Sequence, residues 1–191
     1  MIIVQFSGIG KTTLAALYPQ SVVDFVFMPY KYKVDKNEMF TEASKANFDY
    51  EFIFGWEENY VKAIKQNICD DKILLIPSGF RVLSLLKNEG IQYFLCYPKR
   101  KAKEIYQKRF IERVNTQYFI DIFIGRWDDF MDSLEADSYG RRIVLEPEQY
   151  LSDVININEL LMNSKDVKKI KNPLKNWHFI LFLMNILDIK T

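Results

Sequence analysis

Ile2-Ile-Val-Gln-Phe-Ser-Gly-Ile-Gly-Lys-Thr-Thr-Leu-Ala-Ala-Leu-Tyr18 is the most informative stretch of this sequence. It opens with a short apolar run, Ile2 to Phe6, that is typical of a β-strand, and it closes with helix-forming residues that stop before Pro19. The glycines between them let consecutive backbone N–H groups turn inward around an anion, and the positive end of the helix dipole adds to the attraction. The stretch therefore predicts a strand, a phosphate-binding loop and a helix, in that order.

The predicted loop has the residue types that bind a nucleoside triphosphate. We expect the contacts to phosphate to come from Ser7, Gly8, Ile9, Gly10, Lys11, Thr12 and Thr13. Lys11 is placed to reach the β- and γ-phosphates, and the Thr12 hydroxyl to bind Mg²⁺. The full pattern has another glycine five residues before Gly10, where this chain has Gln5. The loop predicts ATP and Mg²⁺ as cofactors, with Gln5 as a departure from the pattern.

Further along the chain, strand-like and helix-like segments alternate. The other strands are expected at 21–27, 72–77, 92–98 and 142–146. The helices are expected at 12–18, 56–67, 81–88, 101–113, 117–134 and 147–155. Connections of this length allow crossovers between parallel strands, so the pattern predicts an α/β/α fold of three layers with a five-stranded parallel sheet. Ligands of such sheets bind at the carboxyl ends of the strands.

The chain changes character after residue 156. A basic stretch at 165–173 precedes an apolar run at 179–187, which is about half the length that a membrane-spanning helix needs. We expect one domain at 1–156 and an appendage at 157–191, with no membrane span. The apolar run could cover the edge of the sheet, pair with a second copy of the chain, or be loosely ordered.

Composition excludes several other classes of protein. The net charge is +1, from 26 basic and 25 acidic residues, which argues against a nucleic-acid or membrane-surface partner. Cys69 and Cys96 are far apart and are expected to be reduced thiols, and the N-terminus has no signal-peptide pattern, which together predict a cytoplasmic protein. His178 is the single histidine, so neither a Cys/His metal cluster nor a Ser-His-Asp hydrolase is expected.

The chain resembles the P-loop kinases of nucleosides and nucleotides, and more narrowly the adenylate-kinase-like proteins often encoded by bacteriophages and prophages. The resemblance extends over most of the first 155 residues, and only the loop is a specific motif. The residues that carry it are Gly8 to Thr12, Asp24, Trp56 to Tyr60, Tyr97 with Pro98, Arg109 with Arg113, and Glu148 to Asp153. It implies an acceptor-binding region between the second and third strands and a basic helical lid after the fourth.

The same resemblance implies roles for four charged residues. Asp24, at the end of the second strand, would hold Mg²⁺ through water or orient the acceptor; a simple strand-end cap is the alternative. Arg109 and Arg113 lie four residues apart, on one helix face, and would bind the phosphates of donor or acceptor. Arg126 would contact the substrate from the next helix. For the arginines the alternative is a solvated helix with ion pairs to nearby glutamates.

The predicted acceptor region runs from Tyr30 to Trp56 and is rich in aromatic residues that could stack on a base. Trp56, Asn59 and Tyr60 are its candidate substrate-binding residues, with core packing as the alternative. The third strand ends in Pro77-Ser-Gly and lacks the acidic residue that many P-loop proteins have there, so no metal ligand is expected from it.

These observations lead to one expected function and two alternatives. The expected function is transfer of the γ-phosphoryl group of ATP to a small acceptor, most plausibly a nucleoside monophosphate. The first alternative is a nucleotide-dependent switch or binding module, because the loop also looks like that of signalling ATPases. The second is a degenerate P-loop protein without catalytic activity, which Gln5 and Ser78 suggest.

Overall fold

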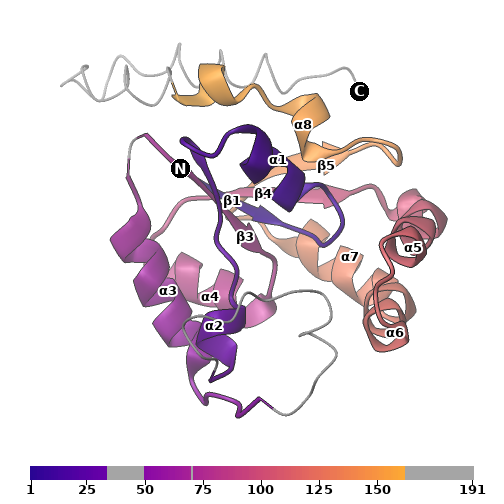
Figure 1. Ribbon diagram of the computed structural model, residues 1–191, viewed down its shortest axis with the longest axis horizontal. Coiled ribbons are helices and arrows are strands. Elements are labelled where there is room, and N and C mark those ends of the chain that lie inside the picture. Colours follow the sequence, from indigo (N-terminus) through magenta and orange to yellow (C-terminus); the bar gives the residue numbers. More distant parts are fainter. Residues whose placement is uncertain (34–49, 70, 162–191) are drawn as a thin grey trace.

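The apolar runs of the sequence form the strands of one parallel sheet in the computed structural model, which describes residues 1–33, 50–69 and 71–161 (Figure 1). The strands are β1 (Ile2–Gln5), β2 (Val22–Asp24), β3 (Ile73–Pro77), β4 (Phe94–Pro98) and β5 (Arg141–Leu145). All four pairings are parallel. The predicted five-stranded parallel sheet is confirmed.

The order of the strands, β2-β3-β1-β4-β5, puts β1 at the centre of the sheet. After β1 the chain moves to β2 at one edge, and after β4 it moves to β5 at the other edge. Where two neighbouring strands send the chain in opposite directions, a crevice opens at their carboxyl ends. This crevice lies directly after Gln5, where the Phe6 N–H donates to the carbonyl of Cys96 at 3.0 Å.

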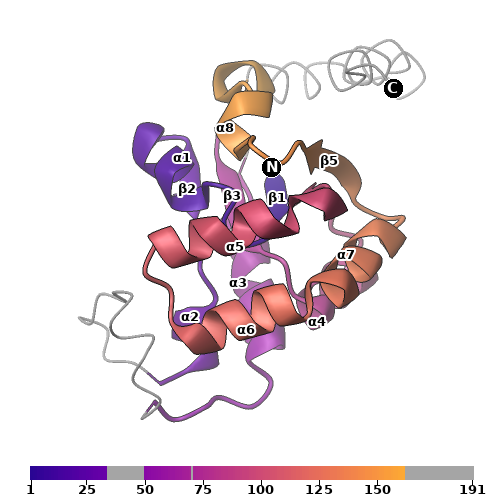
Figure 2. The same ribbon diagram turned by 90° about the vertical axis from the view of Figure 1, so that its right-hand side faces the viewer.

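Helices cover both faces of the sheet. They are α1 (Lys11–Leu17), α2 (Met28–Lys31), α3 (Trp56–Asn67), α4 (Phe80–Asn88), α5 (Lys103–Glu112), α6 (Gln117–Gly125), α7 (Trp127–Ala136) and α8 (Leu151–Val154). In Figure 1, α1 and α8 lie on one face, and α3, α4 and α7 lie on the other. Figure 2 shows α5 and α6 side by side as a separate pair. The arrangement is consistent with the three layers that the sequence predicts.

Two of the expected helices differ from their predicted extents. The segment 117–134 forms two helices, because α6 ends at Gly125 and α7 restarts at Trp127, whose indole N–H donates to the Arg100 carbonyl at 2.9 Å. Trp127 is fully buried, and the change of direction between the helices places it in the core. The segment 147–155 is helical only at Leu151–Val154, since the residues before it form a loop.

The core consists of side chains from all five strands together with apolar side chains of α1 and of α3 to α8. Cys96 is buried in β4, and both it and Cys69 are free thiols, as predicted. The core extends slightly past residue 156, because Ile157 is 1% exposed. None of the helices in the described part is both long and apolar enough to cross a membrane. The rest of the predicted appendage, 162–191, and residues 34–49 of the predicted acceptor region lie outside the described residues.

Candidate functional site

The loop between β1 and α1 has the conformation that its glycines allow. Gly8 has φ 84° and Gly10 has φ 94°, values that residues with a side chain rarely adopt. In the described part of the chain, no backbone carbonyl accepts a hydrogen bond from the N–H groups of Gly10, Lys11, Thr12 and Thr13. These consecutive unpaired donors at the start of a helix are the arrangement that binds an anion.

Gly8 also lets helix α5 pack directly on the loop. A Cβ atom on Gly8 would lie 2.7 Å from Cε1 of Phe110, closer than real carbon contacts allow. Phe110 and its neighbour Tyr106 are both fully buried and meet edge to face. The loop is therefore held between the sheet and an aromatic wall.

Three of the predicted site residues meet on the other side of the loop. Thr12 Oγ1 donates a hydrogen bond to Asp24 Oδ2 at 2.8 Å, and Lys11 Nζ lies 3.2 Å from Asp24 Oδ1. Lys11 and Thr12 begin α1, whereas Asp24 is the last residue of β2. The Lys11 and Asp24 side chains are only 20% and 16% exposed. The fold thus brings together a cation, a hydroxyl and a carboxylate that the sequence had placed on separate elements.

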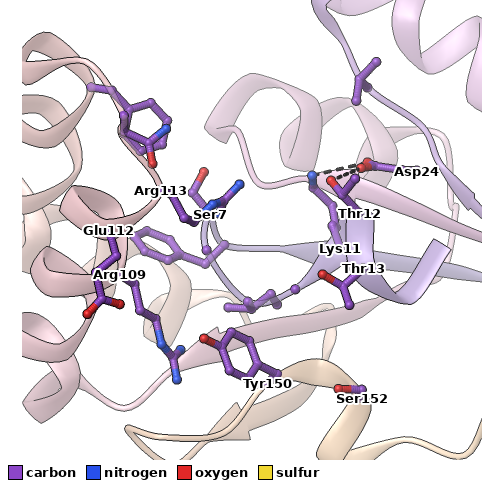
Figure 3. Close-up of a pocket in the computed structure, with 17 residues that line it drawn as sticks. Ser7, Lys11, Thr12, Thr13, Asp24, Arg109, Glu112, Arg113, Tyr150 and Ser152 are labelled. Atoms are coloured by element: carbon purple, nitrogen blue, oxygen red, sulfur yellow. Dashed lines mark hydrogen bonds and ion pairs between the residues drawn. The ribbon is translucent and has the colours of Figure 1, made fainter. Parts of the chain in front are cut away.

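A pocket of about 500 Å³ opens over the loop. Its walls are the loop itself at 6–13, the end of β2 and the C-terminal end of α5 with the residues that follow it. Figure 3 shows Arg109, Glu112 and Arg113 on one side of the loop and Lys11, Thr12 and Asp24 on the other, with Tyr150 and Ser152 on a third side. With three cations against two carboxylates on its walls, the pocket favours an anionic ligand.

The two lid arginines of the prediction lie in different environments. Arg109 is 7% exposed, and its guanidinium donates to the carbonyls of Glu148 at 2.8 Å and Gln149 at 3.4 Å. Arg113 is exposed, lines the same pocket and forms no ion pair with another described residue. Arg113 is therefore the arginine that is available to a ligand, and Arg109 is engaged with the protein.

The lysines and Arg100 of the predicted lid, residues 99–113, are paired with acidic side chains. Arg100 contacts Asp132 at 2.5 Å and Glu135 at 2.9 Å on α7, and these partners raise the pKa of its guanidinium. Lys99 pairs with Glu146, and Lys108 pairs with Glu112 at 3.9 Å. Most of the basic residues of the predicted lid therefore form ion pairs that connect α5, or the turn before it, to neighbouring elements.

The other predicted substrate residues do not line this pocket. Tyr60 is fully buried and its hydroxyl donates to the Phe25 carbonyl; burial, followed by the nearby Asp24 carboxylate, raises the pKa of that hydroxyl. Trp56 packs against Phe27 with ring centroids 5.1 Å apart, and Asn59 is exposed on α3. Tyr60 and Trp56 therefore pack against the aromatic residues that follow β2, which is the core packing given as their alternative.

Arg126 also lies away from the pocket. It is exposed at the junction of α6 and α7, where its guanidinium is 3.2 Å from Asp129 and lies over the ring of Phe130. This is the environment of the alternative reading, a solvated arginine with a local ion pair.

The structure adds pocket residues to which the sequence had given no role in the site. They are Phe6, Val26, Glu112, Asn115, Phe119, Tyr150 and Ser152. Tyr150 and Ser152 fall within Glu148 to Asp153, which carries part of the family resemblance, and Tyr150 follows β5 at the carboxyl edge of the sheet. Phe6 and Val26 lie just past the ends of β1 and β2. Glu112, Asn115 and Phe119 depend on how α5 and α6 fold back over the loop, which no local pattern specifies.

Comparison with known proteins gives no match, either to a protein-family model or to a curated protein.

Proposed function

We propose that this chain binds ATP with Mg²⁺ and transfers the terminal phosphoryl group to a small acceptor, most plausibly a nucleoside monophosphate. The observation that carries the proposal is the meeting of Lys11, Thr12 and Asp24 beside a loop with consecutive unpaired N–H groups. Phosphoryl transfer requires mainly positioning and compensation of charge. The N–H donors of the loop and Lys11 would compensate the phosphate charge, and the oxygens of Thr12 and Asp24 could help to hold a metal.

The residues beside the loop suit Mg²⁺ only in the presence of phosphate. Thr12 and Asp24 offer hard oxygen ligands, the kind that Mg²⁺ prefers. Within the described ranges, no cluster of three or more His, Cys, Asp or Glu side chains could hold a metal alone. Mg²⁺ typically binds one or two protein oxygens together with substrate phosphates, and when bound it would neutralise the charge of the transferred group.

On the opposite wall, Arg113 supplies a second cation. In the proposal Lys11 leaves Asp24 to contact the β- and γ-phosphates, and Arg113 approaches the transferred group from the side of α5. A planar guanidinium binds phosphate oxygens through two parallel hydrogen bonds and stays charged at any physiological pH. The acceptor would enter from the side of Asp24 and α3.

Replacement of the loop lysine tests nucleotide binding. We expect Lys11→Ala to weaken the binding of Mg²⁺-ATP roughly 10- to 150-fold, because a hydrogen bond to a charged group contributes about 1.5–3 kcal/mol. Isothermal titration calorimetry measures the effect. Lys62→Ala, which removes an exposed lysine of α3 outside the pocket, is the matched control and should bind as the parent does. Equal affinities of the parent and Lys11→Ala for Mg²⁺-ATP would show that Lys11 does not contact the nucleotide.

A screen of acceptors tests the transfer. ADP formation from ATP should depend on one nucleoside monophosphate and should appear together with the phosphorylated acceptor. Release of ADP and inorganic phosphate at the same rate without any acceptor would instead identify a hydrolase of the switch class.

A second candidate function, ATP binding that is weak or lost, is favoured by Gln5. Its side chain occupies the position of the missing loop glycine, is 1% exposed, and has no hydrogen-bond partner in the described part of the chain. For this candidate, the parent protein would fail to bind Mg²⁺-ATP and Gln5→Gly would restore binding. Tight binding by the parent would reject it.

A further inference from the structure

The loop between β5 and α8, residues 146–150, lies against the phosphate loop. The Leu151 N–H donates to the Ile9 carbonyl at 3.0 Å, and both residues are buried. The ring of Tyr150 lies beside Gly10, so closely that a Cβ on Gly10 would be 3.3 Å from Cδ1 of the ring. A segment near the end of the domain thus contacts the phosphate loop at two successive residues.

The hydrogen bond from Leu151 has a consequence for the next N–H group of the phosphate loop. In a planar trans peptide, the carbonyl and the N–H point in opposite directions. Because the Ile9 carbonyl points toward Leu151, the N–H of Gly10 points away from α8. Gly10 lines the pocket, and no described backbone carbonyl accepts from this N–H. The bond therefore fixes the orientation of one anion-binding donor.

Arg109 holds Tyr150 and its loop in place. Its guanidinium carbon lies 4.1 Å from the centroid of the Tyr150 ring and 4.8 Å from that of Tyr106. The same group donates to the carbonyls of Glu148 and Gln149, just before Tyr150. At 7% exposure, Arg109 has exchanged most of its water contacts for these protein contacts. The buried guanidinium contacts two tyrosine rings and two carbonyls, and in this way it connects α5 to the loop at 146–150.

We propose that Arg109 and Tyr150 are positioning residues that hold the Ile9–Gly10 peptide in its phosphate-binding orientation without contacting the phosphates themselves. The inference rests on the proposed function, because it assigns the phosphate loop a ligand. It separates Arg109 from Arg113, which the sequence had given one role. It also predicts that Tyr150 affects the binding of the phosphates and not the choice of base.

Comparison of ATP with tripolyphosphate tests this role, since tripolyphosphate has the same three phosphates and no base. Both are titrated with Mg²⁺ into the parent, Tyr150→Ala and Tyr150→Phe. We expect Tyr150→Ala to weaken both ligands by the same factor, about tenfold for the loss of a desolvated cation–π contact. Tyr150→Phe keeps the ring and should bind both ligands as the parent does.

Arg109→Lys provides a second variant if Tyr150→Ala does not give the circular dichroism spectrum of the parent. It keeps the charge and loses the planar fork, so it should also weaken both ligands equally. Loss of affinity for ATP alone would show that Arg109 and Tyr150 contact the base. Unchanged affinity for both ligands would show that the two residues do not affect the phosphate loop. Either result overturns the inference. A parent that binds neither ligand would refute the proposed function and the inference together, whereas a parent that binds both leaves the variants to decide the inference alone.

Discussion

Gln5 is a polar residue in a position that the core would fill with an apolar one. Neither of its amide atoms finds a partner among residues 1–33, 50–69 and 71–161, and an unpaired buried polar group costs about 1–3 kcal/mol. We expect Gln5→Leu, which nearly conserves the volume, to raise the free energy of unfolding by about 1 kcal/mol. Urea denaturation measures it. A lower free energy of unfolding for Gln5→Leu would show that the amide makes a stabilising contact.

Single residues also show how far the site could be read from the sequence. Lys11, Thr12 and the two glycines could be predicted because a phosphate loop is a local pattern. A role for Asp24 beside Lys11 and Thr12 was expected only from the family resemblance, because β3 lies between β2 and β1 in the sheet. By contrast, the different environments of Arg109 and Arg113 depend on carbonyl groups at Glu148 and Gln149, which are distant in the sequence.

Packing between elements gives a second reason for glycine at position 8, in addition to its positive φ. Gly8 and Gly90 both have positive φ, 84° and 66°, but only at Gly8 would a Cβ meet another residue within 4 Å. We expect Gly8→Ala to lower the free energy of unfolding by about 1–3 kcal/mol more than Gly90→Ala does, because α5 must move away from the loop. Thermal unfolding of the two variants measures the difference. Equal effects would mean that α5 adapts without strain.

The ends of a helix or strand could be predicted where a local apolar pattern sets them. They could not be predicted where tertiary contacts set them. Helix α3 begins and ends at Trp56 and Asn67, as predicted. The predicted helix 117–134 is divided because Trp127 turns into the core, and the helix predicted at 147–155 is shortened because Arg109 holds the carbonyls of the preceding loop. Both departures come from partners that a local pattern does not contain.

The stability of the whole molecule toward acid depends in part on individual carboxylates, because protonation at low pH removes contacts that only the charged form makes. Asp137 is one of them. Partial burial raises its pKa, but the N–H of Gly140, the hydroxyl of Tyr93 and the N–H of Tyr139 outweigh burial, and the pKa is lowered below its ordinary 3.8. A lowered pKa in the folded state stabilises the protein above pH 3.8, and this contribution is lost as the pH falls through the folded value.

Asp137→Asn should therefore reduce the free energy of unfolding at neutral pH, by about 1 kcal/mol for weakened hydrogen bonds to a charged acceptor. The difference between parent and variant should shrink as the pH falls below 3.8. Urea unfolding at neutral pH and at low pH gives both values. A difference that stays constant over this range would mean that the carboxylate charge of Asp137 does not contribute.

The bond between the Leu151 N–H and the Ile9 carbonyl also bears on the synthesis of the chain. A ribosome makes Ile9 early and Leu151 late, so the emerging polypeptide holds an incomplete loop while most of the domain is translated. A ligand that stabilises only the completed loop adds nothing to a nascent chain before Leu151 has emerged from the exit tunnel. Before that point the chain folds on the strands and helices already synthesised, without stabilisation from such a ligand.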